Sequence, residues 1–200
     1  MLDSVCDVLK EAYARGWISA RDGNASVRLI HENFFHTTPS GVRKHKLDSE
    51  SFFEIGFDEH DKPIVLDKNK PGQPTGEILL HAALQKRTLE NRVVLHLHPT
   101  YLIAALYKGL NLEILAQEFP EINRYTKVGP SVGIIPPISR ELAQAATEAL
   151  NLSEDGSIEY DIIGLDRHGV ISVGNDPWVA FEHIERLEHI CQIVLVSGVY

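Results

Sequence analysis

The period of the apolar residues changes along this chain from that of a helix to that of a strand, and this change constrains the fold more than any other feature of the sequence. Residues 2–13 carry apolar side chains at helical spacing, and the pattern stops near Gly16. Residues 25–30 then alternate between apolar and polar side chains, and residues 33–37 continue as a second extended segment beyond a short polar turn. The opening of the chain therefore predicts a helix followed by a β-hairpin.

The rest of the chain mixes strands and helices in the same way. Further strands are expected at residues 52–57, 63–66, 93–98, 161–165 and 170–173, the last two forming a hairpin bent at residues 167–169. Helices are expected after Thr75, over residues 100–108, from Ser139 to about residue 150, and from Asp176 and Pro177 onward. Hairpin-connected strands with helices before, between and after them predict an α/β fold in which helices cover a mainly antiparallel sheet.

The length of 200 residues, of which 44% are hydrophobic, is enough for one sizeable core, and we expect a single domain over residues 1–200. The two cysteines, Cys6 and Cys191, lie in helix-like segments at opposite ends of the chain, without the spacing of a metal or redox motif. We expect them to be reduced thiols in the core rather than a disulfide.

The formal net charge of -9 restricts the class of partner. A negative chain repels nucleic acid and anionic membrane surfaces, so neither is expected as a partner, and an anionic small substrate needs a local positive group. The N-terminal residues contain neither a signal peptide nor an apolar run long enough to span a membrane. The sequence therefore predicts a cytoplasmic protein.

Two histidines occupy the apolar strand expected at residues 93–98. His96 and His98 are two residues apart, so both imidazoles project from one face of the strand and can reach the same ion. The chain holds ten histidines, so such a pair also arises by chance. Two imidazoles among valines and leucines nevertheless need polar partners, and one metal ion satisfies both.

A third ligand is expected from His168, at the bend before Gly169, where a loop side chain can point into a cleft. Taken alone, His168 is equally well explained as an ordinary turn residue. Three imidazoles would leave the fourth position of a zinc ion open for water, substrate or a carboxylate. That arrangement is typical of catalytic rather than structural zinc.

A carboxylate and several small-residue turns complete the candidate groups. With Thr75 as N-cap, Glu77 lies in the first turn of the expected helix, where it either interacts with the helix dipole or serves as an acid/base group. The turns at residues 23–26 and 37–41 can surround a phosphate with amides and hydroxyls, although each is also an ordinary turn. The cationic run at residues 43–46 favours a solvated loop slightly over direct ligand contact.

Five motifs in this order resemble the class II aldolase/adducin family over nearly the whole chain. They are Gly23-Asn24-Ala25-Ser26, Thr38-Pro39-Ser40-Gly41, Thr75-Gly76-Glu77, His96-Leu97-His98-Pro99 and His168-Gly169. The family includes aldolases of L-fuculose phosphate and L-rhamnulose phosphate, L-ribulose-phosphate 4-epimerase and methylthioribulose-phosphate dehydratase. The resemblance implies a three-layer α/β/α fold around an antiparallel sheet, and a homotetramer whose active sites lie between neighbouring subunits.

The resemblance also implies roles for the residues that match. His96, His98 and His168 would bind one zinc ion per subunit or another divalent metal, and Glu77 would be the catalytic acid/base residue. The phosphate of a small phosphorylated sugar would be bound by Asn24, Ser40, Gly41, Thr75 and Gly76. The implied activity is a zinc-dependent aldolase that cleaves a small ketose phosphate by retro-aldol chemistry through a metal-stabilised enediolate.

Two positions depart from the family pattern or match it loosely. The family often has two serines before the glutamate, where this chain has Thr75 and Gly76, so one phosphate-binding hydroxyl is missing. Some aldolases use a tyrosine of the neighbouring subunit to protonate the departing aldehyde, and Tyr125 matches it in a slightly shifted register. Tyr200 at the end of the chain is an alternative for that tyrosine.

Other activities remain open at this level. Family members with the same metal set act as dehydratases, decarboxylases or 4-epimerases of phosphorylated sugars. The epimerase commonly has aspartate at the position of Glu77, so glutamate favours the other three activities. A non-catalytic, adducin-like scaffold is the alternative from another class, but such members lack the metal set that this sequence contains in full.

Overall fold

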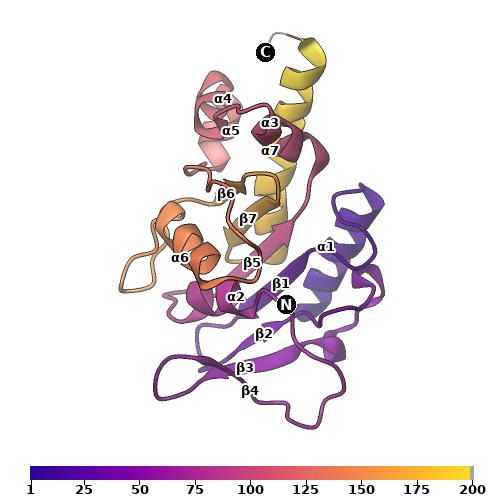
Figure 1. Ribbon diagram of the computed structural model, residues 1–200, viewed down its shortest axis with the longest axis vertical. Coiled ribbons are helices and arrows are strands. Elements are labelled where there is room, and N and C mark those ends of the chain that lie inside the picture. Colours follow the sequence, from indigo (N-terminus) through magenta and orange to yellow (C-terminus); the bar gives the residue numbers. More distant parts are fainter. Residues whose placement is uncertain (199–200) are drawn as a thin grey trace.

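A seven-stranded sheet runs through the middle of the molecule (Figure 1). The computed structural model describes residues 1–198. Within them the strand order is β4-β3-β2-β1-β5-β7-β6, and each pair of neighbouring strands is antiparallel. The strands are β1 (Asn24–Arg28), β2 (Phe35–Thr37), β3 (Phe53–Phe57), β4 (Pro63–Val65), β5 (Arg92–Leu97), β6 (Ile162–Leu165) and β7 (Gly169–Gly174).

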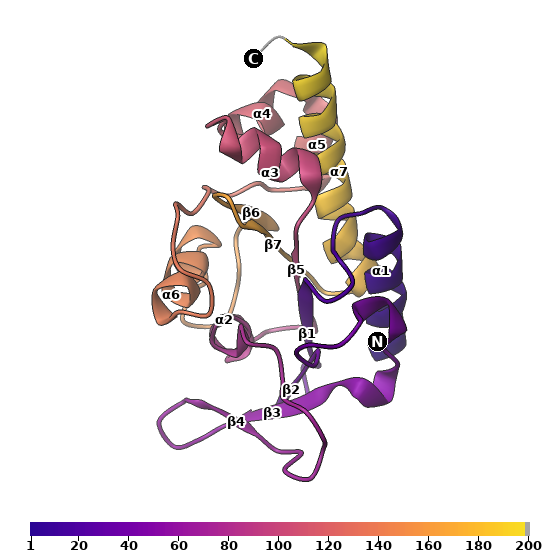
Figure 2. The same ribbon diagram turned by 45° about the vertical axis from the view of Figure 1, so that its right-hand side comes forward.

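Helices cover both faces of this sheet, as the turned view in Figure 2 shows. On one face lie α1, α7 and α3, with α4 and α5 packed beside α7; on the other lie α2 and α6. The helices are α1 (Leu2–Ala14), α2 (Ile78–Gln85), α3 (Thr100–Tyr107), α4 (Leu112–Glu118), α5 (Pro120–Tyr125), α6 (Arg140–Ala149) and α7 (Pro177–Ser197), with 3₁₀ turns η1 (Lys44–Lys46) and η2 (Ser49–Ser51). The expected three-layer α/β/α fold with an antiparallel sheet is confirmed.

The central strand β5 is buried along its whole length. It pairs with β1 on one side and β7 on the other, so both of its backbone edges are hydrogen-bonded within the sheet. Leu95 and Leu97 pack toward α1, α3 and α7, whereas Val94 packs toward α2 and α6. His96 follows Val94 by two positions, so its imidazole points to the α2 and α6 face.

The structure changes one predicted helix start and adds two helices. Helix α2 begins at Ile78 and Glu77 occupies the N-cap position, so the expectation that Thr75 caps this helix is wrong. The Thr75 hydroxyl instead accepts a hydrogen bond from the Glu77 amide in the turn before the helix. Helices α4 and α5 were not predicted, although Asn111 caps α4 with two hydrogen bonds and Pro120 opens α5.

Two smaller expectations can also be compared with the structure. Cys6 and Cys191 are both free and buried, which confirms the prediction of core thiols. Burial raises the pKa of the Cys191 thiol to about 12, which keeps it protonated. Over residues 1–198, no helix is both long and apolar enough to cross a membrane.

Helix α2 places one histidine deep in the protein. His81 is fully buried against β1, where its ring nitrogens hydrogen-bond to the side chains of Asn24 and Ser26. Burial lowers the pKa of His81 to about 4, despite the opposing negative charge of Glu77. His81 is therefore neutral in the folded protein at neutral pH.

This burial predicts a pH dependence of stability in the metal-free protein. Between about pH 6.5 and about pH 4 the unfolded chain protonates His81 and the folded chain does not, so the unfolded state binds more protons. The contribution of neutral, buried His81 to the free energy of unfolding is thus fully present above about pH 6.5. This contribution is lost as the pH falls toward about 4. Urea unfolding at several pH values measures how steeply the free energy of unfolding changes with pH. We expect a shallower change in His81→Gln than in the wild type, and equal slopes in the two proteins would contradict the prediction.

Candidate metal centre

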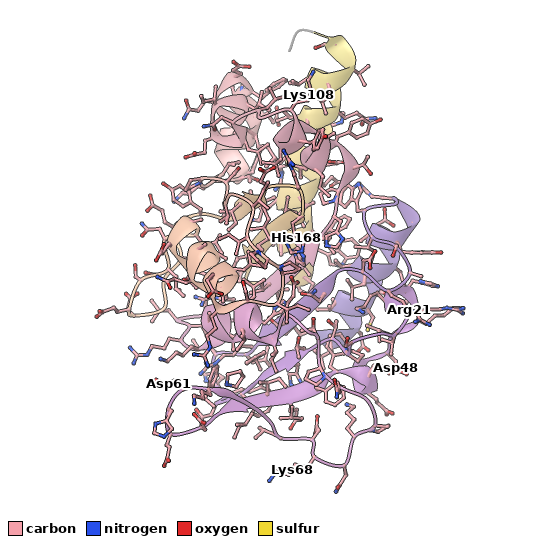
Figure 3. All side chains as sticks on the ribbon, in the orientation of Figure 1. Arg21, Asp48, Asp61, Lys68, Lys108 and His168 are labelled. Atoms are coloured by element: carbon pink, nitrogen blue, oxygen red, sulfur yellow. The ribbon has the colours of Figure 1, made fainter. Side chains whose placement is uncertain are left out.

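The pairing of β5 with β7 brings three histidines together from distant parts of the chain. In this pair His96 lies opposite Ile171 and Leu97 lies opposite Val170, so the residue before β7 reaches the end of β5. His168 is that residue, at the bend between β6 and β7. It lies near the centre of the view in Figure 3.

The ring nitrogens of these histidines converge on one point. The Nε2 atom of His96 lies 3.1 Å from Nε2 of His98 and 3.3 Å from Nε2 of His168. One nitrogen from each ring lies within 4.8 Å of the others, a spacing that one metal ion can bridge. The sequence-predicted set is thus assembled in space by residues from β5, the segment after it and the β6–β7 bend.

Hydrogen bonding and burial prepare the imidazoles to bind a cation. His96 Nδ1 lies 2.9 Å from the Val170 carbonyl oxygen, and by donating its proton there it leaves the Nε2 lone pair facing the centre. Burial first, and then the neighbouring imidazoles, lower the pKa of His98 to about 4 and also lower that of His168. Both rings are therefore neutral near pH 7, as metal ligation requires.

Gly169 makes the close approach of the two strands possible. A Cβ atom at this position would lie 2.5 Å from the Leu97 carbonyl oxygen and 2.7 Å from Cδ2 of His98. Both contacts are too short for any side chain, so only glycine lets β7 begin directly beside the histidines. In the His168-Gly169 motif, His168 thus supplies a candidate metal ligand, and Gly169 allows the two strands to pack closely.

Glu77 places one carboxylate beside the three rings. Its Oε2 atom lies 3.3 Å from His96 Nε2 and its Oε1 atom lies 3.5 Å from His168 Nε2. Asn24 donates a hydrogen bond of 2.9 Å from Nδ2 to Oε2. Burial opposes ionisation of this carboxyl, but His96 and the Asn24 hydrogen bond outweigh it, so the pKa of Glu77 lies below its usual value. The carboxylate is ionised and acts as a hydrogen-bond acceptor.

A cleft of about 220 Å³ opens in front of the histidines and Glu77. The five residues predicted to bind a phosphate all line it: Asn24, Ser40, Gly41, Thr75 and Gly76. The bridge between Pro39 and Pro74 holds the two turns side by side, and Ser40 and Thr75 donate their amides to Gln73 and Thr38. A larger cavity of about 760 Å³ between α1, α3 and α7 contains none of these groups.

Lys44 lines the same cleft, which the sequence did not lead us to expect. Only 2% of this residue is exposed, and its Nζ donates to the carbonyl oxygens of Arg21 and Val42 at 3.0 and 3.3 Å. Burial lowers the pKa of Lys44, partly offset by Asp22. The interpretation of residues 43–46 as a solvated loop is therefore wrong for Lys44, whereas Arg43 and Lys46 are exposed.

Ile138 forms another unexpected wall of the cleft. Its φ angle of 62° lies in the left-handed region, which a β-branched residue rarely adopts and which is often found at functional sites. A Cβ atom on Gly76 would lie 3.0 Å from Ile138 Cδ1. The absence of a side chain at Gly76, where the family often has serine, therefore makes room for Ile138.

Tyr125 lies away from this cleft within the same chain. It is on α5, 48% exposed, and its ring is stacked against the guanidinium groups of Arg124 and Arg186. Any contact with an active site would therefore be with that of a neighbouring subunit. Tyr200, the alternative tyrosine, is outside the described residues.

Comparison with known proteins agrees with this architecture. Residues 3–195 match the family described as Class II Aldolase and Adducin N-terminal domain. An L-fuculose phosphate aldolase of Methanococcus maripaludis is 27% identical, covering 94% of this chain and 91% of its own. A methylthioribulose-1-phosphate dehydratase of Persephonella marina is 29% identical over 92% and 84% of the two chains.

Among solved structures, L-fuculose-1-phosphate aldolase from Thermus thermophilus superposes with a TM-score of 0.76 at 26% identity, covering 98% of this chain and 94% of its own. The motif order, the sheet topology and these matches agree. The chain belongs to the class II aldolase and adducin family.

Proposed function

We propose that this protein is a zinc-dependent aldolase that cleaves a small ketose phosphate by retro-aldol chemistry. The observation that carries the proposal is the convergence of three imidazoles on one point beside an ionised carboxylate, within an open cleft. Relatives named as aldolases of L-fuculose phosphate support the reaction class and the substrate class.

The residues present fit a divalent ion of the zinc type. His96, His98 and His168 would supply three nitrogen ligands, and a zinc ion held by three imidazoles would keep a fourth position for water or substrate, as in catalytic zinc sites. When bound there, the ion supplies positive charge that stabilises negative charge developing on the carbonyl and neighbouring hydroxyl oxygens of the substrate. A lysine Schiff base is not required for cleavage of this kind.

Glu77 is assigned the proton transfer at the carbon next to the substrate carbonyl. Its carboxylate lies within 3.5 Å of two of the imidazoles, so a substrate held at the same centre has its reacting carbon within reach. Cleavage of the carbon–carbon bond leaves an electron pair on this carbon and releases the proton of the hydroxyl that becomes the aldehyde carbonyl. Glu77, once it has taken up a proton from the substrate, delivers it to this carbon, so one proton moves from oxygen to carbon overall. Tyr125 of a neighbouring subunit, within a homotetramer, is assigned the proton transfer at the oxygen of the departing aldehyde. It accepts the hydroxyl proton in cleavage and returns it in the reverse direction.

The turns around the cleft are assigned the substrate phosphate. Ser40 and Thr75 offer hydroxyls, Gly41 and Gly76 offer backbone amides, and Asn24 keeps one amide proton beyond the one it donates to Glu77. Lys44 adds the positive charge that an anionic substrate needs in a chain of net charge -9.

A second candidate is the dehydration of a phosphorylated sugar, which the relative named methylthioribulose-1-phosphate dehydratase favours. Both reactions use a divalent ion and an acid/base group, and they differ in whether a carbon–carbon or a carbon–oxygen bond breaks. A metal assay on the purified protein, followed by a screen of ketose 1-phosphates, tests both. Release of dihydroxyacetone phosphate supports the aldolase, loss of water without chain cleavage supports the dehydratase, and a protein that binds no metal contradicts both.

Replacing Glu77 by glutamine tests its assigned role. The variant retains the three imidazoles, so we expect it to bind zinc like the wild type, while kcat falls by about 10²–10⁴-fold because the proton-transfer group is lost. Zinc titration and steady-state kinetics measure the two effects. Glu182→Gln, a change at an exposed residue of α7, is the matched control and should leave both values unchanged. Full turnover by zinc-loaded Glu77→Gln would eliminate this role.

Replacing Lys44 by methionine tests the positive charge at the phosphate. Loss of a charge-assisted contact is expected to raise KM for a ketose phosphate by about tenfold or more. KM for the same sugar without phosphate should be nearly the same in Lys44→Met as in the wild type. This comparison distinguishes the loss of a charge contact from general damage to the cleft. Lys46→Met, at an exposed neighbour, is the control. An equal rise in KM for both sugars would show that Lys44 does not act on the phosphate.

A further inference from the structure

A chain of buried polar side chains runs from Glu77 into the core between α2 and β1. Asn24 contacts Glu77, His81 contacts Asn24, Ser26 contacts His81, and Gln85 contacts Ser26. Ser26, His81 and Gln85 have no exposed surface, and Asn24 and Glu77 are 8% and 7% exposed. The chain thus has one end at the cleft and the other in the interior.

Starting from Glu77, each hydrogen bond determines the direction of the next. An ionised carboxylate only accepts, so the NH₂ group of Asn24 faces Glu77 and its Oδ1 faces His81. His81 must then donate from Nε2, which leaves Nδ1 of the neutral ring as an acceptor. Ser26 lies 2.7 Å from Nδ1 and therefore donates its hydroxyl proton there.

The interior end is compatible with the same directions. Gln85 donates from Nε2 to the Arg92 carbonyl oxygen at 3.2 Å, which orients its NH₂ group. The same NH₂ group donates to Ser26 Oγ at 2.9 Å, so the Ser26 hydroxyl proton is free to point at His81. The Glu77 end therefore specifies one tautomer of His81, with the proton on Nε2, and one orientation of the Asn24 amide, and the Gln85 end accommodates both.

Packing alone does not explain this arrangement. Burying several polar groups is costly unless each finds a partner, and apolar side chains of similar size would fill the same space without that cost. The surrounding residues of α2 that face the sheet, such as Leu80 and Leu84, are apolar. The polar chain instead leads to Glu77, whose Oε2 accepts from Asn24 while its Oε1 lies 3.5 Å from His168 Nε2.

We propose that His81 is a positioning residue for Glu77. In its neutral form protonated on Nε2, His81 orients the Asn24 amide so that it donates to Oε2 of Glu77, and Ser26 and Gln85 maintain this tautomer. The carboxylate is thereby held with Oε1 directed at the reacting carbon. This inference rests on the acid/base role proposed for Glu77, and it assigns no contact between His81 and the substrate.

Two substitutions of His81 distinguish the loss of its hydrogen bond to Asn24 from a change in the volume of the side chain. In His81→Gln the side-chain amide can place an N–H near the former Nε2 and still donate to Asn24, whereas His81→Leu removes the donor. Leu80→Ala, a buried neighbour on α2, is the matched control for loss of packing without loss of the polar chain. Each protein is assayed for zinc affinity and for kcat and KM on the ketose 1-phosphate that the wild type cleaves fastest.

We expect His81→Leu to lose about tenfold or more in kcat, with KM within about threefold and zinc affinity unchanged, because the orientation of the acid/base group is lost and substrate binding is not. His81→Gln and Leu80→Ala should keep kcat within about threefold of the wild type. A His81→Leu protein that turns over like Leu80→Ala overturns the proposal. So does a His81→Gln protein as slow as His81→Leu.

A measurement without substrate tests the proposal independently of the reaction. ¹⁵N NMR of histidine-labelled, metal-free protein, with the His81 signals assigned by their loss in His81→Gln, reports which ring nitrogen carries the proton. We expect a protonated Nε2 and an unprotonated Nδ1 at pH 7, and the opposite tautomer overturns the proposal. The opposite tautomer overturns the His81 inference and leaves the proposed function intact, whereas a wild type that turns over no sugar phosphate overturns the proposed function and with it the role that the inference gives to Glu77.

Discussion

The register between β5 and β7 is the interaction on which the rest of the structure depends. It places His96 opposite Ile171 and brings the start of β7 beside the end of β5. A slip of one residue would turn the side chains of β5 to the opposite face and separate His96 from His168. Such a slip would also turn the His96 imidazole into the apolar layer around Leu95 and Leu97, which is costly for an unpartnered polar group, so the packing of the core also specifies the geometry of the centre.

Desolvation has opposite effects on the two kinds of group at this centre. It lowers the pKa values of His98 and His168, which suits them to bind a cation, and by itself it raises the pKa of Glu77. The neighbouring imidazole of His96 and the hydrogen bond from Asn24 reverse this effect for Glu77. Near pH 7 the same buried site therefore holds neutral His98 and His168 beside an ionised acid/base group.

Much of this could be predicted from sequence because the signals are local. The alternation along the strands, the two-residue spacing of His96 and His98, and the Asp176-Pro177 helix start each depend on a few neighbouring residues. The Asn111 cap of α4 and the Pro120 start of α5 are equally local signals. The burial of Lys44, the contact between Gly76 and Ile138, and the chain from His81 to Glu77 join residues far apart in sequence, and no periodicity or single motif encodes such contacts.

The binding of one divalent ion by His96, His98 and His168 is tested most directly by X-ray absorption at the zinc edge, on protein loaded with one equivalent of zinc. We expect three imidazole nitrogens at about 2.0–2.1 Å and a fourth light ligand, which is the coordination of a catalytic zinc site. Substitution of any one of these histidines should remove one imidazole from the spectrum or abolish binding. A spectrum with one imidazole or none, or one that the substitutions do not change, would contradict the assignment of the centre and with it the aldolase activity.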